Sequence, residues 1–140
     1  MKVFFKIAGL IAVVFFAFSC TNDKEKSRLF LDKGIDYLYH SAFDEAIINF
    51  DKAIECDPEN FSAYYYRGCA KFNNFRYEES KTDFEKAIEI NPDYVDPYFN
   101  LGLYYRDINN DMSMACYYFK KAEALGRPSM EDYTKYCDYY

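Results

Sequence analysis

A spacing of 34 residues recurs along the chain, and this repeat constrains the fold more than any other feature of the sequence. The recurring positions hold an aromatic residue, a glycine, a phenylalanine, an alanine and a proline. In the first unit they are Phe30, Gly34, Phe50, Ala53 and Pro58, and in the second they are Tyr64, Gly68, Phe84, Ala87 and Pro92. Self-similarity at a period of roughly 20–50 residues is the signature of stacked structural repeats. The sequence therefore predicts a solenoid in which each unit packs on its neighbours.

A third unit follows with one inserted residue. A further step of 34 residues reaches Tyr98, Gly102 and Tyr105, the last of which matches Tyr37 of the first unit. The pattern then runs one residue late, which places the insertion near residues 109–112. Its late positions are Ala115, Phe119 and Ala122. The predicted units span about residues 27–60, 61–94 and 95–128.

Each unit is predicted to form a hairpin of two helices. The glycine of the first helix is expected to face a small residue of the second, as Gly34 would face Ala46, so that the two backbones approach closely. With only 5 Gly and 4 Pro in the chain, long helices joined by short turns are favoured over a sandwich or a barrel. Helices are predicted near residues 27–40, 44–56, 61–74, 78–90, 95–108 and 112–125.

The last unit needs a cover, because a hairpin repeat cannot bury its apolar face alone. Residues 129–140 are predicted to form a short capping helix, in which Ser129 and Asp132 have the spacing of a capping box. The expected fold is thus an all-α solenoid of three helix-turn-helix hairpins plus a C-terminal capping helix, over residues 29–140.

The order of recurring residue types within a unit, namely aromatic, Gly, Tyr, Ala, Phe, Ala and Pro, resembles the tetratricopeptide repeat over about residues 27–128. The chain departs from that pattern where Lys33 and Arg67 replace the preferred leucine and where Lys71 replaces the tyrosine of the other two units. The resemblance implies a domain that binds another protein or a peptide segment and needs no cofactor.

A second stripe of side chains lies on the first helix of every unit, one residue along from the packing stripe. One residue is about 100° around a helix, so this stripe cannot face the hairpin partner. Its members are Leu31, Ile35, Leu38, Tyr65, Cys69, Phe72, Phe99, Leu103 and Arg106. The resemblance implies that they line a concave groove that holds partner segments. The alternative is that part of the stripe packs against the neighbouring hairpin or the N-terminal tether.

Some tetratricopeptide proteins grip a C-terminal carboxylate in this groove through Lys, Arg and Asn. Leu31 and Ile35 occupy the corresponding places of the first unit, so we do not expect carboxylate binding.

The N-terminus has the pattern of an export signal. Lys2 and Lys6 precede an uncharged stretch over residues 7–18, which is shorter than the roughly 20 residues that a spanning helix needs. Residues 1–19 are therefore predicted to be a signal peptide. Ala17 and Ser19 satisfy the small-x-small rule of an ordinary signal-peptidase site, and an uncleaved anchor is the other alternative.

Cys20 ends the apolar stretch, and residues 17–20 resemble the lipobox of bacterial lipoproteins. Ala17 and Phe18 depart from the usual leucine and small residue, whereas Ser19 fits. The resemblance implies that Cys20 is lipidated, for example with palmitate, and that residues 20–28 are a polar tether. The expected location is the bacterial cell envelope, on a membrane and outside the cytoplasm.

Charge and motifs exclude several functions. The formal charge of −6 becomes −6 − 2 = −8 without Lys2 and Lys6, which disfavours binding to nucleic acid. His40 falls in a predicted turn. The acidic pairs at residues 44–45 and 78–79 fall at helix starts, where carboxylates meet the helix dipole favourably. We predict no enzyme activity and no metal site.

One group of residues has the spacing that begins a calcium loop: Asp107, Asn109 and Asp111. Met112 stands in the glycine place of such a loop and Tyr118 in the place of the bidentate glutamate, so calcium binding is not expected.

Four cysteines remain besides Cys20. A turn at residues 126–128 would fold two helices antiparallel and bring Cys116 near Cys137, where a disulfide could form. Cys56 and Cys69 fall on predicted helices and are expected to be small buried thiols.

The sequence thus predicts an interaction module or assembly factor of the bacterial envelope that binds a partner segment in its groove. The alternatives are a passive structural lipoprotein and an enzyme with an unrecognised site.

Overall fold

The computed structural model describes residues 23–135 and 137–139, and this part of the chain consists of helices joined by turns, with no strand. Six long helices are followed by a short helix α7 (Glu131–Thr134) and a 3₁₀ turn η1 (Cys137–Tyr139). The long helices are α1 (Lys24–Tyr39), α2 (Phe43–Cys56), α3 (Phe61–Asn73), α4 (Tyr77–Ile90), α5 (Val95–Asp107) and α6 (Met112–Ala124). The predicted signal peptide and Cys20 lie outside the described residues.

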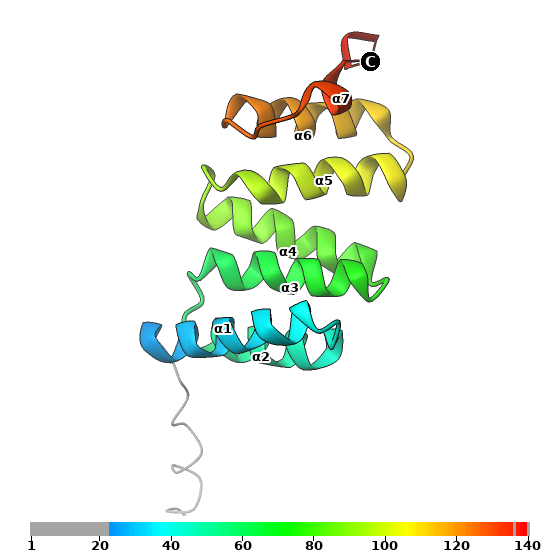
Figure 1. Cartoon of the computed structure of the whole chain (residues 1–140). Helices are drawn as coiled ribbons and strands as arrows, with labels where there is room; N and C mark the ends of the chain where they lie inside the picture. Colours follow the sequence, from blue (N-terminus) through cyan, green and yellow to red (C-terminus); the bar gives the residue numbers. More distant parts are fainter. Residues whose placement is uncertain (1–22, 136, 140) are drawn as a thin grey trace, which may run out of the picture.

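The helices pair into three hairpins, α1 with α2, α3 with α4 and α5 with α6. These hairpins stack along one axis, and α7 and η1 follow at the far end of the stack (Figure 1). The prediction of a three-hairpin solenoid is confirmed. Within the described part of the chain, no helix is long and apolar enough to span a bilayer.

A buried phenylalanine holds each hairpin closed. Phe50, Phe84 and Phe119 are each at most 1% exposed, and an alanine three residues later is fully buried in every unit. A Cβ atom added to Gly34 would lie 2.5 Å from Phe50 Cε1, and one added to Gly102 would lie 2.3 Å from Phe119 Cε1. We expected each glycine to face a small residue of the second helix. The structure shows that a phenylalanine ring of that helix also packs directly against the glycine.

Helix α1 begins at Lys24, so residues 24–28 of the predicted tether are helical. Asp23 caps this helix by accepting a hydrogen bond from the Lys26 amide at 3.0 Å. Ser27 is fully buried, and its hydroxyl donates to the Ala53 carbonyl at 2.8 Å. The early start has a physical reason, since it brings the buried Ser27 hydroxyl within reach of a hydrogen-bond acceptor in α2.

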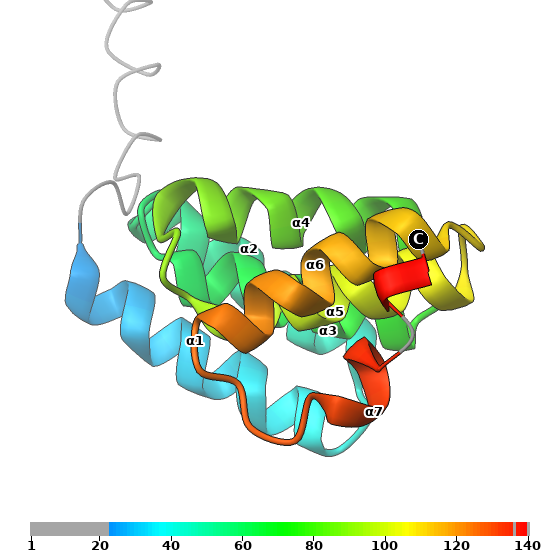
Figure 2. The same cartoon turned by 90° about the horizontal axis from the view of Figure 1, so that it is seen from above.

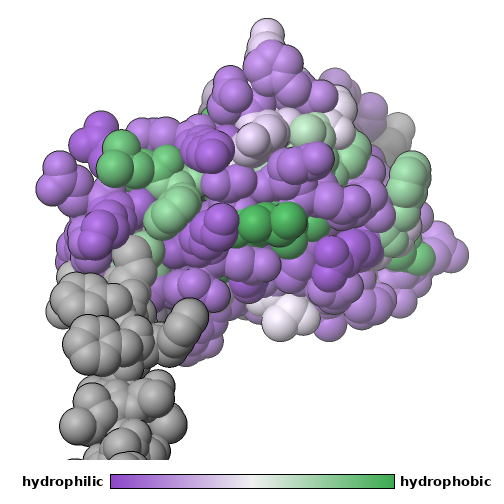
Figure 3. Space-filling view, turned by 90° about the horizontal axis from the view of Figure 1, so that it is seen from below, coloured by the Kyte–Doolittle hydropathy of each residue, from purple (hydrophilic) through white to green (hydrophobic). Residues whose placement is uncertain are grey.

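The two ends of the stack differ in how they are covered. Leu29 holds the place that Ala63 fills in the second unit, but Leu29 is 64% exposed whereas Ala63 is fully buried between units. The face at this end is mostly hydrophilic, with separated apolar side chains (Figure 3). At the other end Met130 is buried. The predicted capping box is wrong, because α7 starts after Met130 without a side-chain cap.

Candidate functional site

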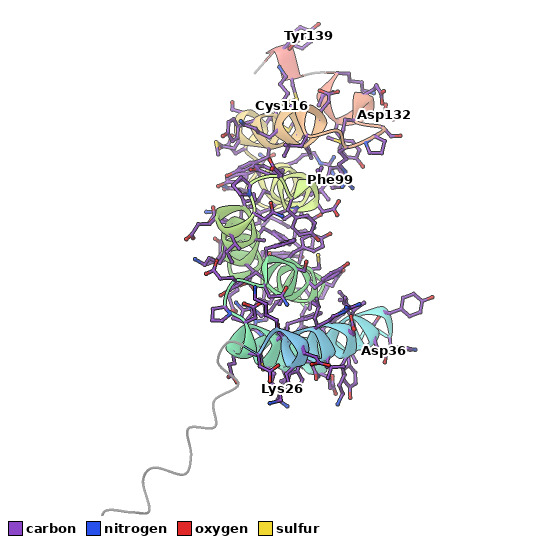
Figure 4. The ribbon with its side chains drawn as sticks, turned by 90° about the vertical axis from the view of Figure 1, so that its left-hand side faces the viewer. Lys26, Asp36, Phe99, Cys116, Asp132 and Tyr139 are labelled. Carbon is purple, nitrogen blue, oxygen red and sulfur yellow. A yellow bond between two sulfur atoms is a disulfide. The ribbon has the colours of Figure 1, made fainter. Side chains whose placement is uncertain are left out.

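The solenoid has a concave side. The first hairpin and the C-terminal segment project to the same side, and α3 and α5 lie recessed between them (Figure 4). The first helix of each unit, α1, α3 and α5, lies toward this side.

A cavity of about 320 Å³ lies between α3 and α5, with Phe84 of α4 contributing to its wall. It is lined by Tyr65, Cys69, Phe72, Asn73, Phe84, Asn100 and Leu103. Aromatic contacts behind the cavity fix two of these side chains: Tyr65 packs at 6.1 Å from Phe84, and Phe72 at 5.1 Å from Tyr77, between ring centroids. The cavity is thus formed without a ligand, which lowers the cost of binding one.

The polar groups of the cavity are uncharged at neutral pH. Burial raises the pKa of Cys69 to about 12, and the Asn100 amide lies within 3.5 Å of its sulfur. Burial also raises the pKa of Tyr65 above its usual range. Because a thiol with such a pKa stays protonated, Cys69 is not an activated nucleophile. The cavity suits recognition of an apolar side chain by shape and by a few amide hydrogen bonds.

The structure divides the nine predicted stripe residues into three sets. Tyr65, Cys69, Phe72 and Leu103 line the cavity. Leu31, Ile35 and Leu38 are half-buried against the core of the first hairpin, beside Ala46, Ile47 and Phe50. Phe99 and Arg106 contact Tyr133 of α7. The groove is therefore open at its middle, while its two ends are partly filled by the chain itself.

Sequence reasoning missed three lining residues: Phe84, which it assigned to the core, and the two asparagines Asn73 and Asn100. Asn73 is four residues after Cys69 and Asn100 is three residues before Leu103, so both share a helical face with a stripe residue. This spacing could have found them, but the stripe was restricted to three residues per helix.

The two departures from the repeat pattern in the second unit belong to one buried ionic network. Arg67 donates from Nε and Nη2 to the two carboxylate oxygens of Asp83, at 3.0 and 2.6 Å, and from Nη1 to Asp51 at 2.6 Å. Lys71 Nζ lies 2.8 Å from the same carboxylate, which is only 3% exposed. Burial opposes the charge of Arg67, but the hydrogen bonds and negative charges of Asp83 and Asp51 together outweigh this effect and raise the pKa of Arg67. The network fixes α3 between α2 and α4 and so positions the cavity wall.

The remaining chemical candidates have structural roles. His40 ends α1 and is exposed, with Nδ1 2.8 Å from the Asp36 carbonyl. The acidic pairs lie in the first turns of α2 and α4, as predicted. Asp111 caps α6 by accepting from the Met114 amide at 3.0 Å. Within the described part of the chain, no three His, Cys, Asp or Glu side chains are grouped to hold a metal.

The cysteines differ in their bonding. A disulfide joins Cys116 and Cys137, whose Cα atoms are 5.3 Å apart. Cys69 is a free thiol. Cys56 is buried at the end of α2 and disulfide-bonded, so the expectation of a free buried thiol there is wrong.

Two family profiles match the middle of the chain. One, described as a tetratricopeptide repeat, matches residues 49–82, and the other, described as a TPR repeat, matches residues 76–107. No curated protein matches the chain in sequence.

Several solved structures are similar. The TPR domain of Arabidopsis OM64 has a TM-score of 0.76 at 19% identity, covering 84% of this chain and 98% of that one. The first TPR domain of Spaghetti (RPAP3), bound to the HSP90 peptide SRMEEVD, has a TM-score of 0.76 at 20% identity, covering 84% and 94%. The TPR2B domain of yeast Sti1, in a pHsp70 complex, has a TM-score of 0.74 at 18% identity, covering 82% and 98%. The chain therefore contains tetratricopeptide repeats and has the fold of the solenoids that such repeats build.

Proposed function

We propose that this chain is a protein-interaction module that binds a segment of a partner protein in its groove, without catalysis. The observation that carries the proposal is the preformed cavity of about 320 Å³ between α3 and α5, which four residues of the predicted stripe line. One similar domain, that of Spaghetti, has been solved with an HSP90 peptide, and another, that of Sti1, has been solved in a pHsp70 complex.

The chemistry of the cavity favours an apolar partner side chain. Among the described residues that line it, none is a cation, so an acidic peptide such as SRMEEVD would find no charge partner there. Aromatic and leucine side chains form most of the lining, and two asparagine amides can bond the backbone of a bound segment. We therefore propose a partner segment that inserts an aromatic or branched aliphatic residue.

Selection from a displayed library of random peptides against the purified chain tests this proposal. The selected peptides should share a large apolar residue, and the Cys69→Trp variant should lose them because the indole fills the cavity. A loss of at least about tenfold in affinity is expected. Tyr117→Ala is a matched control, since Tyr117 is 52% exposed on α6 and does not line the cavity.

Other outcomes favour other functions. If no peptide is selected and groove substitutions change nothing, the chain is better described as a passive structural lipoprotein. Peptides rich in Asp and Glu would contradict the apolar chemistry while keeping the interaction function. Turnover of a substrate by the purified chain would support the alternative hypothesis that the protein is an enzyme.

We further propose that the module works in a bacterial cell envelope, anchored through a lipid on Cys20 after removal of residues 1–19. The support is the sequence pattern of that region. Acyl labelling in cells should mark the wild-type chain and fail on Cys20→Ala, and that variant should leave the membrane fraction.

Peptide mapping gives an independent check of the anchor. A thioether to lipid and a disulfide use the same sulfur, so a disulfide between Cys20 and Cys56 in the mature protein would contradict lipidation. Labelling that persists in Cys20→Ala would do the same.

A further inference from the structure

The described C-terminal segment, residues 127–135 and 137–139, lies over one end of the groove. Seen from above, it runs from the end of α6 along the side of the stack on which α1 lies, and α7 sits on that side (Figure 2). The Tyr133 ring packs 4.9 Å from Phe99 of α5 and 5.2 Å from Phe119 of α6, between centroids. The segment thus contacts a stripe residue as well as the core of the last hairpin.

Phe99 is held by a second residue of the same segment. The Arg127 guanidinium carbon lies 3.8 Å from the Phe99 ring centroid, and Arg127 Nη1 donates to Asp96 at 2.5 Å. Arg106, the other stripe residue at this end, has its guanidinium carbon 5.5 Å from the Tyr133 ring. Both stripe residues are therefore engaged by the chain itself instead of being free for a partner.

Apart from its disulfide, the segment is attached by side-chain contacts, among them Arg127 with Phe99 and Asp96 and Thr134 with Glu123. Helix α7 has only 4 residues, which is too short to be stable alone. The ion pair between Lys120 and Asp138 is 2.8 Å long and exposed, so it contributes little. Met130 and Tyr133 supply the apolar contacts. The Cys116–Cys137 bond closes a loop of 21 residues and prevents the segment from leaving.

We propose that this described C-terminal segment, residues 127–135 and 137–139, is a cover over the third-unit end of the groove, and that the Cys116–Cys137 disulfide latches this cover. Opening it exposes Phe99, which lies four residues before Leu103 on α5 and so extends the cavity along one helical face. The groove then accepts a longer apolar segment. This inference rests on the proposed function, because it describes regulation of the same groove.

The latch opens by reduction with a dithiol, either a small molecule or a protein with two neighbouring cysteines. One thiolate of the reductant attacks a sulfur of the disulfide, the S–S bond breaks, and the other cysteine leaves as a thiolate that takes a proton. The second thiol of the reductant then resolves the mixed disulfide. In total, two electrons and two protons pass to Cys116 and Cys137, and the reductant becomes a disulfide.

Both sulfur-bearing residues are shielded, since Cys116 is 4% exposed and Cys137 is 5% exposed. Attack therefore has to wait until η1 lifts from α6, which makes reduction slow for a reductant that meets the closed form. A partner that competes for Phe99 would speed the reduction by holding the cover open.

Hydrogen exchange and a fluorescent probe of apolar surface test the inference on the full mature chain. Cys137→Ser removes the latch without reducing any other disulfide, and Tyr133→Ala weakens the cover with the disulfide intact. In both variants, amides of residues 127–135 and 137–139 should exchange at least about tenfold faster, and anilinonaphthalene sulfonate fluorescence should rise. Tyr139→Ala is the matched control, because Tyr139 is 83% exposed in η1 and should change neither signal.

The outcomes separate the cover from the groove. Faster exchange together with at least about tenfold tighter binding of library-selected peptides supports the inference. Faster exchange with unchanged peptide binding overturns regulation of the groove, and unchanged exchange in Cys137→Ser overturns the latch. If neither wild type nor variants select any peptide, the proposed function fails and the regulation with it, while the exchange data still report whether the cover opens.

Discussion

The second and third units fill the same three positions of the hairpin with opposite chemistry. Where the second unit has Arg67, Lys71 and Asp83, the third has Leu101, Tyr105 and Tyr118. The three residues of the second unit form a buried network of charges. In the third unit, the rings of Tyr105 and Tyr118 stack with their centroids 5.4 Å apart. The helices nevertheless pair in the same way in both units.

This difference shows that the three positions can be either charged or apolar, provided that the side chains at all three match one another. A buried ion pair contributes little net stability compared with well-packed apolar residues, but a single charge left without its partner is costly. The second unit should therefore be more sensitive to single substitutions than the third, although neither set is needed to define the fold.

The largest effect is expected from Asp83→Ala, which leaves Arg67 and Lys71 buried without their shared carboxylate. The free energy of unfolding should fall by about 3–5 kcal/mol, as measured by urea denaturation. Asp51→Ala is the matched control, because the Asp51 side chain is 48% exposed and its loss should cost at most about 1 kcal/mol. Equal losses for the two variants would show that the buried network does not hold the hairpin.

A transplant of the third unit's set into the second should have the opposite sign. The triple variant Arg67→Leu, Lys71→Tyr and Asp83→Tyr should fold, with a free energy of unfolding that is unchanged or raised by about 1–4 kcal/mol. Its stability should also depend less on salt than that of wild type. A variant that is less stable than Asp83→Ala would mean that the two sets are not interchangeable in this backbone.

The glycine positions sharpen the comparison further. A Cβ on Gly102 would lie 2.3 Å from Phe119, against 2.7 Å between Gly68 and Phe84. Overpacking of this kind costs about 1–3 kcal/mol, so Gly102→Ala should lower the thermal midpoint more than Gly68→Ala does. If Gly68→Ala lowered the thermal midpoint more than Gly102→Ala, the apolar hairpin of the third unit would accommodate an added methyl group more easily than the ionic hairpin of the second unit.

Alkaline pH should weaken the third unit by a smaller, graded amount. Burial, with a lesser contribution from Tyr105, raises the pKa of Tyr118 from 10.0 to about 12. The neutral phenol therefore contributes stability that is complete below about pH 10 and is lost as the pH rises through about 12. Urea midpoints at about pH 9 and about pH 11 should differ less for Tyr118→Phe than for wild type. An equal decrease would assign the alkaline loss to other groups.

Much of the fold could be predicted from the repeat, because glycine, phenylalanine and alanine recur at positions that only a packed hairpin explains. The start of α1 could not, since the charged residues 24–28 have the composition of a tether. What makes them helical is the burial of the Ser27 hydroxyl against Ala53, together with a 2.8 Å hydrogen bond from Asn60, 33 residues away. Sequence pattern carries no sign of such a distant partner.

The candidate site could be predicted at its middle but not at its ends. Tyr65 and Cys69 follow from helical spacing alone. Phe99 has the same spacing, yet it lies beneath Tyr133 because the chain reverses through Gly126 and Ser129, at φ values of 91° and 57°. The direction of that final segment depends on the backbone of a short turn, which a repeat pattern does not specify.

The early start of α1 also limits how far the domain can move if Cys20 carries a lipid. Only residues 21–23 then separate the anchor from the helix, and a chain extends at most about 3.6 Å per residue, so the first hairpin stays within about 14 Å of the anchored residue. The solenoid would diffuse in two dimensions, within a thin layer next to the bilayer. Proteins in the same membrane would meet its groove at a high effective concentration, and a weak contact would be enough to hold them there.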